Sequence, residues 1–133
     1  MYRKLLLILP VAVLLAAGCG GKQAGLTNPA FQPEIVNQTD SFSFQATNVV
    51  NVTQTVQYTW QNTGTTANVD HSSQITSGSA MLTILDSGGQ QVYMAPLSPT
   101  GTFATASGTA GGWTIQVVVS DLDATLNFSA QRP

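Results

Sequence analysis

Charged side chains are rare in this sequence. They make up 8% of its 133 residues, against about 25% in an average soluble domain. Only four residues are Lys or Arg, and two of these, Arg3 and Lys4, stand at the very start. So few cations exclude the basic surface that nucleic-acid binding requires.

Cysteine and histidine are each present once. Cys19 cannot form a disulfide within the chain, and a single thiol excludes a zinc site built from cysteines. His71 stands between Asp70 and Ser72. Neighbours in a strand point to opposite faces, so these three residues do not form a catalytic triad. We therefore predict that the protein is not an enzyme, and we expect His71 in an exposed loop or edge strand.

The first 19 residues have the three parts of a secretory signal peptide. Arg3 and Lys4 form a basic start, residues 5–15 are largely apolar, and residues 16–18 are small. This order is typical of a segment that directs secretion and is then removed. The alternative is an uncleaved anchor helix, but the apolar stretch is shorter than the roughly 20 residues that span a bilayer.

The end of this segment, Ala16-Ala17-Gly18-Cys19, resembles the lipobox of bacterial lipoproteins, where Leu is more usual at the first position. The resemblance implies cleavage between Gly18 and Cys19, a diacylglycerol on the sulfur of Cys19 and an acyl chain such as palmitate on the new N-terminus. Two acyl chains are enough for stable anchoring without a transmembrane helix. Asp at position 20 would resemble an inner-membrane retention signal, and the residue there is Gly20. The resemblance thus implies a lipid-anchored protein of the bacterial cell envelope, at the outer membrane rather than the inner one if the host is Gram-negative.

Composition divides the chain into three parts. We expect a signal peptide at residues 1–18, a lipidated N-terminus and flexible tether at 19–33, and a folded domain at 34–133. The tether is rich in Gly, Asn, Gln and Pro and has no apolar periodicity, as flexible linkers do. After residue 18 two cations face six carboxylates, a net charge of −4, so charge would not draw the mature part to anionic lipid.

Apolar and polar residues alternate with period two in the rest of the chain, which predicts half-buried strands. A hairpin turn is predicted at residues 86–89, Asp-Ser-Gly-Gly, and a tight turn at residues 121–123. No helical period follows residue 19. Seven or eight short strands predict an all-β fold, a small antiparallel β-sandwich of jelly-roll type, because one sheet alone would leave its apolar face in water. The strands are expected at residues 41–46, 56–61, 80–85, 91–94, 102–106, 113–120 and 126–131.

The C-terminal half contains Gly111-Gly112-Trp113-Thr114 at the start of a predicted strand, after a Gly-rich stretch. This pattern resembles bacterial pre-peptidase C-terminal domains and related jelly rolls. The resemblance implies a fold and not an activity, since the protease that usually accompanies such domains has no counterpart in a chain of this length.

Two acidic residues, Asp121 and Asp123, could offer oxygen ligands to Ca²⁺, and calcium is frequent in jelly-roll domains. A calcium site needs about six oxygens, whereas Asp residues in a turn commonly bond their own backbone. We favour the structural role and keep the metal site as the alternative.

Three aromatic residues, Trp60, Trp113 and Tyr58, could stack on a sugar ring. Both Trp residues are in phase with apolar neighbours of their strands, so burial in the core is the simpler interpretation. The sequence thus predicts a lipid-anchored envelope protein with a non-catalytic binding or structural module, with an envelope protein or a glycan as partner. The alternative is a calcium-dependent carbohydrate-binding module.

Overall fold

The computed structural model describes residues 25–133 and shows an all-β domain. All strand pairs are antiparallel, and hydrogen bonds join the seven strands into one sheet. The elements are a 3-10 helix, η1 (Pro29–Phe31), and the strands β1 (Glu34–Gln38), β2 (Ser41–Asn62), β3 (Asn68–His71), β4 (Gln74–Leu85), β5 (Gln91–Pro96), β6 (Gly101–Ala104) and β7 (Gly111–Gln131). Among these residues no helix is long and apolar enough to cross a membrane.

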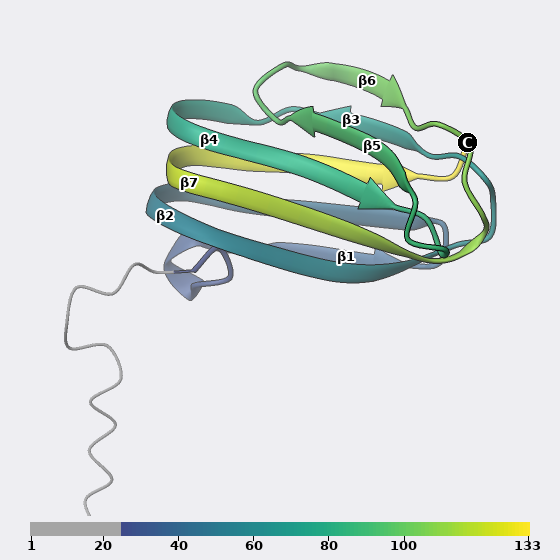
Figure 1. Cartoon of the computed structure of the whole chain (residues 1–133). Helices are drawn as coiled ribbons and strands as arrows, with labels where there is room; N and C mark the ends of the chain where they lie inside the picture. The colour runs from purple at the N-terminus through teal and green to yellow at the C-terminus, as the bar shows by residue number, and fades with distance from the viewer. Residues whose placement is uncertain (1–24) are drawn as a thin grey trace, which may run out of the picture.

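The sheet is bent on itself into the two layers of a small β-sandwich (Figure 1). The first layer holds β1, residues 41–46 of β2, residues 126–131 of β7, β3 and β6. The second layer holds residues 54–62 of β2, residues 111–119 of β7, most of β4, and β5. The predicted sandwich is therefore confirmed.

Two long strands connect the layers, where the sequence predicted two pairs of separate strands. β2 and β7 pair along most of their length, and their register shifts between Ala46 and Gln54 as both strands change layer. The bend uses left-handed backbone at Asn48, Asn51 and Asp121, which Asn and Asp tolerate better than other residues. We call this side of the sandwich, residues 47–53 of β2 and 120–124 of β7, the bend end.

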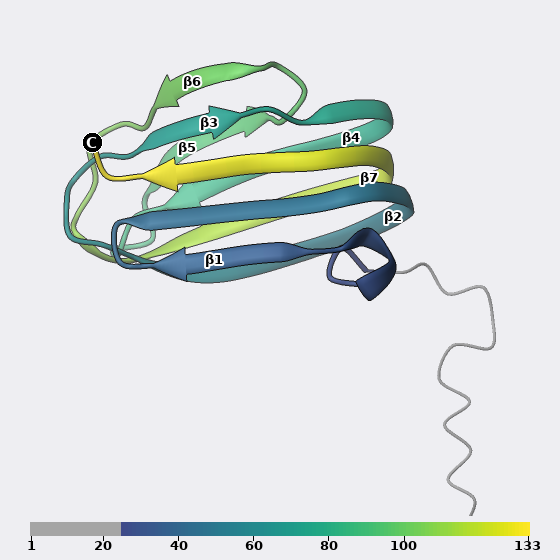
Figure 2. The ribbon, with the colours of Figure 1, turned by 180° about the vertical axis from the view of Figure 1, so that it is seen from behind.

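The opposite side, the loop end, carries the connections at residues 63–67, 86–90 and 105–110. The predicted hairpin turn at residues 86–89 lies here, between β4 and β5. The chain enters the domain beside the bend end, whereas its C-terminus lies at the loop end (Figure 2).

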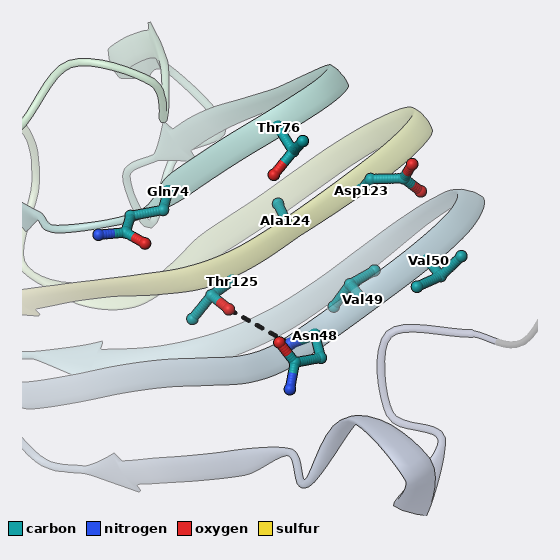
Figure 3. Close-up of a pocket in the computed structure, with 8 residues that line it drawn as sticks. All are labelled: Asn48, Val49, Val50, Gln74, Thr76, Asp123, Ala124 and Thr125. Carbon is teal, nitrogen blue, oxygen red and sulfur yellow. Dashed lines mark hydrogen bonds between the residues drawn. The ribbon is translucent and has the colours of Figure 1, made fainter.

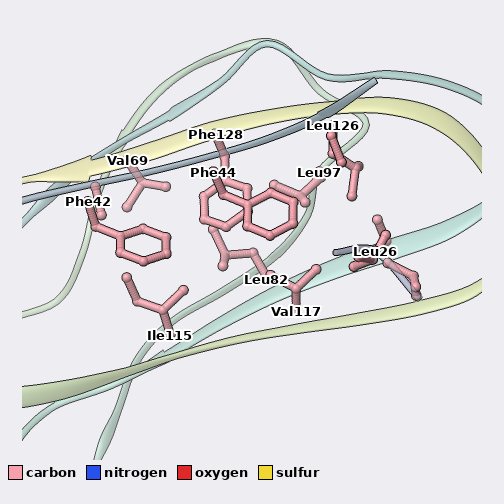
Figure 4. Packing of buried hydrophobic residues seen from close by; sticks show 14 of the residues in the cluster. Leu26, Phe42, Phe44, Val69, Leu82, Leu97, Ile115, Val117, Leu126 and Phe128 are labelled. Atoms are coloured by element: carbon pink, nitrogen blue, oxygen red, sulfur yellow. The ribbon is translucent and has the colours of Figure 1, made fainter. Parts of the chain in front are cut away.

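Alternating side chains of both layers fill a common core (Figure 4). The rings of Phe44 and Phe128 stack with centroids 5.4 Å apart, and Phe42 lies 6.1 Å from Phe128. Each such ring removes about 150–250 Å² of surface from water when it is buried. The period of two along each strand thus places one apolar face of each layer in the shared core.

Two local predictions are wrong. The turn expected at residues 121–123 is part of β7, because Asp121 forms a bulge that bends the strand and Leu122 is buried in the core. The tether expected to continue to residue 33 joins the domain earlier. Leu26 is 0% exposed and Phe31 is buried, while Asn28 caps η1 by accepting a hydrogen bond from the Ala30 amide.

Candidate functional site

A pocket of about 310 Å³ lies at the bend end, and we call it the bend pocket (Figure 3). Strands β2, β7 and β4 line it side by side. Its lining residues are Asn48, Val49, Val50, Gln74, Thr76, Asp123, Ala124 and Thr125.

The pocket exists because the strands change register there. Val49 and Ile75 both pair with Ala124, the residue at the centre of this region. On either side the ladders shift, between Ala46 and Val52 in β2 and between Ile75 and Ser79 in β4. Bulges of this kind remove regular side-chain rows and increase the local twist. Since Ala124 is also small, a hollow opens over it.

Polar groups dominate the walls of the bend pocket. Its amides belong to Asn48 and Gln74, and its hydroxyls to Thr76 and Thr125. The backbone N–H of Asn48 donates to Oγ1 of Thr125 at 3.2 Å, which ties β2 to β7 at one wall. Val49 and Ala124 belong to the buried core behind the pocket, and the exposed apolar side chain of the lining is Val50.

The two carboxylates proposed as calcium ligands hold the bend together. Oδ1 of Asp123 accepts a hydrogen bond from the Asn51 backbone N–H at 2.7 Å, and Oδ2 accepts one from the Ser77 hydroxyl at 3.1 Å. Oδ1 of Asp121 accepts a hydrogen bond from the Thr53 hydroxyl at 3.5 Å, and the same hydroxyl accepts one from the Asp121 backbone N–H at 2.9 Å. No group of three acidic, His or Cys side chains suited to a metal occurs among residues 25–133. The residues at the bend therefore fit the structural role better than a calcium site.

The two Trp residues are fully buried at the loop end, as the phase of their strands predicted. They face each other from paired positions of β2 and β7, with centroids 6.0 Å apart and rings nearly perpendicular. Nε1–H of Trp60 donates to the Gln38 carbonyl at 3.0 Å, and that of Trp113 donates to the Thr109 carbonyl at 2.8 Å. Neither ring is available to stack on a sugar.

Tyr58 belongs to the core as well. Its ring lies 5.4 Å from Phe42 and 6.1 Å from Phe44, and the residue is half-buried. Burial raises the pKa of its hydroxyl. The three aromatic residues considered for a ligand face thus stabilise the fold, and the structure does not bring them to the bend pocket.

The expectation for His71 is wrong. It is 2% exposed, and its strand β3 lies between β6 and β7 and not at an edge. Its Nε2 shares a 3.0 Å hydrogen bond with the Tyr93 hydroxyl, and the Phe103 ring lies 5.0 Å away. Nδ1 is buried without a hydrogen-bond partner among the described residues. Burial lowers the pKa of His71 below 6.5; the nearby Pro99 carbonyl and the Asp70 carboxylate partly offset this shift.

Two carboxylates organise the loop end. Asp86 accepts hydrogen bonds from the backbone N–H groups of Gly88, Gln90 and Thr109 at 2.8–2.9 Å. Asp40 accepts from the N–H and hydroxyl of Thr63 and lies 3.6 Å from the Arg132 guanidinium. The bonds from Thr109, Gln90 and Gly88 lower the pKa of Asp86, and those from Thr63, with Arg132, lower that of Asp40.

Sequence reasoning did not single out the bend pocket. Its residues come from three strands, and only the register shifts bring them together. The visible signal was the break in alternation at residues 47–53.

Gly18 and Cys19, the predicted cleavage and lipidation residues, lie outside the described residues, so the lipobox stays a prediction. The Gly-Gly-Trp-Thr pattern of residues 111–114 lies at the start of β7.

No protein-family model matches the chain, and no curated protein is significantly similar to it.

Proposed function

We propose that this protein is a lipid-anchored component of the bacterial cell envelope and that its β-sandwich is a non-catalytic binding module. Cys19 holds the lipid, and Gly20 favours the outer membrane over the inner one if the host is Gram-negative. The observation that carries the anchor is the position of the only cysteine, directly after a basic start, an apolar stretch and three small residues.

The chemistry of the bend pocket supports binding over catalysis. Its one ionisable side chain is Asp123, and both oxygens of that carboxylate accept hydrogen bonds from the bend itself. General acid–base catalysis needs a titratable group free to exchange a proton with a substrate. A pocket of neutral amides and hydroxyls can instead recognise a ligand by shape and hydrogen bonds.

Lipidation is tested by growing a bacterium that expresses the full chain with an alkyne analogue of palmitate. The label should appear on the protein, and the protein should sediment with membranes. Cys19→Ser should lose both properties, while Ser72→Ala in the body of the domain should keep them. An unlabelled wild-type chain, or a label that survives Cys19→Ser, would disprove the anchor.

The binding role is tested with residues 20–133, expressed without the signal peptide and Cys19 and immobilised as bait. We expect it to retain an envelope protein or a glycan from solubilised envelopes. Repeated failure to retain either would argue for a structural role.

A further inference from the structure

The bend pocket offers unused hydrogen-bonding groups. The side-chain amides of Asn48 and Gln74 and the hydroxyl of Thr76 line it, and none of the three has a hydrogen-bond partner among the described residues. Each amide supplies both a donor and an acceptor, and the hydroxyl supplies both as well. Such a set matches a ligand whose own groups both donate and accept, such as an alcohol or a secondary amide.

The charges that line the pocket exclude ionic ligands. No cation lines the pocket. Arg132 is the only Lys or Arg among the described residues, and it lies at the loop end beside Asp40. A phosphate or carboxylate ligand would meet the Asp123 carboxylate with nothing to neutralise it. A cationic ligand would find both oxygens of Asp123 already accepting hydrogen bonds from Asn51 and Ser77. The ligand that fits is therefore uncharged.

The apolar part of the pocket completes the match. Val49 and Ala124 belong to the core behind the pocket, with 1% and 6% of their surfaces exposed, so the apolar side chain that a ligand can contact is Val50 at the rim, which is 60% exposed. Sugar rings carry hydroxyl groups around their edge and C–H groups on their faces, so they suit polar walls beside the exposed apolar side chain of Val50. We propose that the bend pocket binds one uncharged saccharide unit bearing hydroxyl or acetamido groups. This proposal rests on the binding role above and names its ligand class.

The position of the pocket points to a ligand near the membrane. The backbone N–H of Leu26 donates to Oε1 of Gln54 at 2.8 Å, which fixes the start of the domain beside the bend end. Five residues lie between Cys19 and Gly25, and the six Cα-to-Cα steps span at most about 22 Å in any conformation. A lipid on Cys19 would therefore hold this end of the sandwich close to the bilayer surface, where sugars occur both free and as lipid headgroups.

The test uses ¹⁵N-labelled residues 20–133, titrated with glucose, N-acetylglucosamine and glucuronate while backbone amide shifts are measured. We expect glucose or N-acetylglucosamine to shift the amides of residues 48–50, 74–76 and 123–125, with glucuronate weaker than glucose because of Asp123. Gln74→Ala and Thr76→Val should each weaken binding by roughly 2- to 10-fold, the effect of losing one neutral hydrogen bond.

Matched controls make the same chemical changes away from the pocket. Gln57→Ala and Thr83→Val alter the outer face of the second layer and should leave the affinity unchanged. If neither neutral sugar shifts the bend, or if the shifts are unaffected by Gln74→Ala and Thr76→Val, the proposal is overturned. That result would leave the lipid-anchor test on Cys19 untouched, so the two failures are distinguishable.

The source of the sugar is tested with the lipidated chain in phosphatidylcholine vesicles, with or without a neutral glucosyl lipid. Protection of the bend-end amides from hydrogen exchange only when the vesicles carry the glucosyl lipid would identify a headgroup. Protection by free glucose alone would identify a soluble sugar. Protection by neither sugar source would count against the site.

Discussion

At the loop end, two buried indoles meet edge to face, and the carboxylates of Asp40 and Asp86 are tied to neighbouring backbone. At the bend end, the strands shift register, a small Ala124 lies between them, and polar side chains surround a pocket. Loops are usually where a sandwich binds its ligands. Here the loops are held by internal hydrogen bonds, whereas the irregular bend leaves polar groups free. The loop end accounts for stability, and the bend end is where we expect binding.

The largest effect should follow from removing an indole. Trp113→Ala leaves a cavity beside Trp60 and should lower the free energy of unfolding by about 3–5 kcal/mol, measured by urea denaturation. Val118→Ala is the control, because Val118 lies on the same strand but is exposed; it should change stability by less than about 0.5 kcal/mol. Equal losses in both variants would contradict the assignment of the indoles to the core.

Two glycines, one at each end, allow the cost of a left-handed backbone to be separated from the cost of a steric clash. Gly78 at the bend and Gly89 in the hairpin turn both have positive φ, 76° and 82°. A Cβ on Gly78 would collide with the backbone carbonyl of Asp121, whereas a Cβ on Gly89 would meet nothing within 4 Å. Gly89→Ala should cost about 1–2 kcal/mol from left-handed backbone alone.

Gly78→Ala should cost more than Gly89→Ala, since backbone atoms must also move. Thermal unfolding of the two variants side by side measures the difference. A Gly78→Ala protein as stable as Gly89→Ala would show that the bend is softer than the hairpin turn.

Acid should weaken the loop end through Asp86. Its carboxylate accepts three backbone hydrogen bonds that lower its pKa from 3.8. The stability it provides is fully present above the pKa of the unfolded chain and is lost as pH falls through the lower folded value. Asp86→Asn should therefore melt at a lower temperature than wild type at pH 6, and the difference in melting temperature should shrink below pH 3. A difference that stays constant from pH 6 to below pH 3 would exclude the charge of Asp86 as the cause.

Periodicity predicted the parts of the fold that depend on one strand at a time. Alternation placed Trp60 and Trp113 in the core, and the Asp-Ser-Gly-Gly sequence located the hairpin turn. Alternation could not show that residues 41–46 and 56–61 belong to one strand, because their continuity depends on pairing with β7 across the bend. The burial of Leu26 was missed since a single apolar residue among polar ones has no period. The bend pocket was missed because it depends on the register between strands that are far apart in sequence.

The last prediction concerns pH near neutrality and tests whether β3 and β6 open independently of the Trp pair at the loop end. Burial lowers the pKa of His71 from 6.5, so the unfolded chain takes up a proton more readily than the folded one. Stability is then complete above about pH 6.5 and declines as pH falls toward the lower folded value. The charged ring would face Tyr93 from β5 and Phe103 from β6, and on its own strand only Asp70 carries a charge.

Because His71 lies where β3 and β6 pair, amides of β6 should exchange hydrogen faster at pH 5.5 than at pH 7, after correction for intrinsic rates. Amides of residues 58–61 of β2, beside Trp60, should change less. His71→Phe keeps an aromatic ring but removes the titrating group, so its β6 amides should show no difference between the two pH values. If wild type and His71→Phe loosen alike, the sensitivity belongs to another group. If residues 58–61 loosen as much as β6, the sandwich opens as one unit and the loop end is no more rigid than the strands around His71.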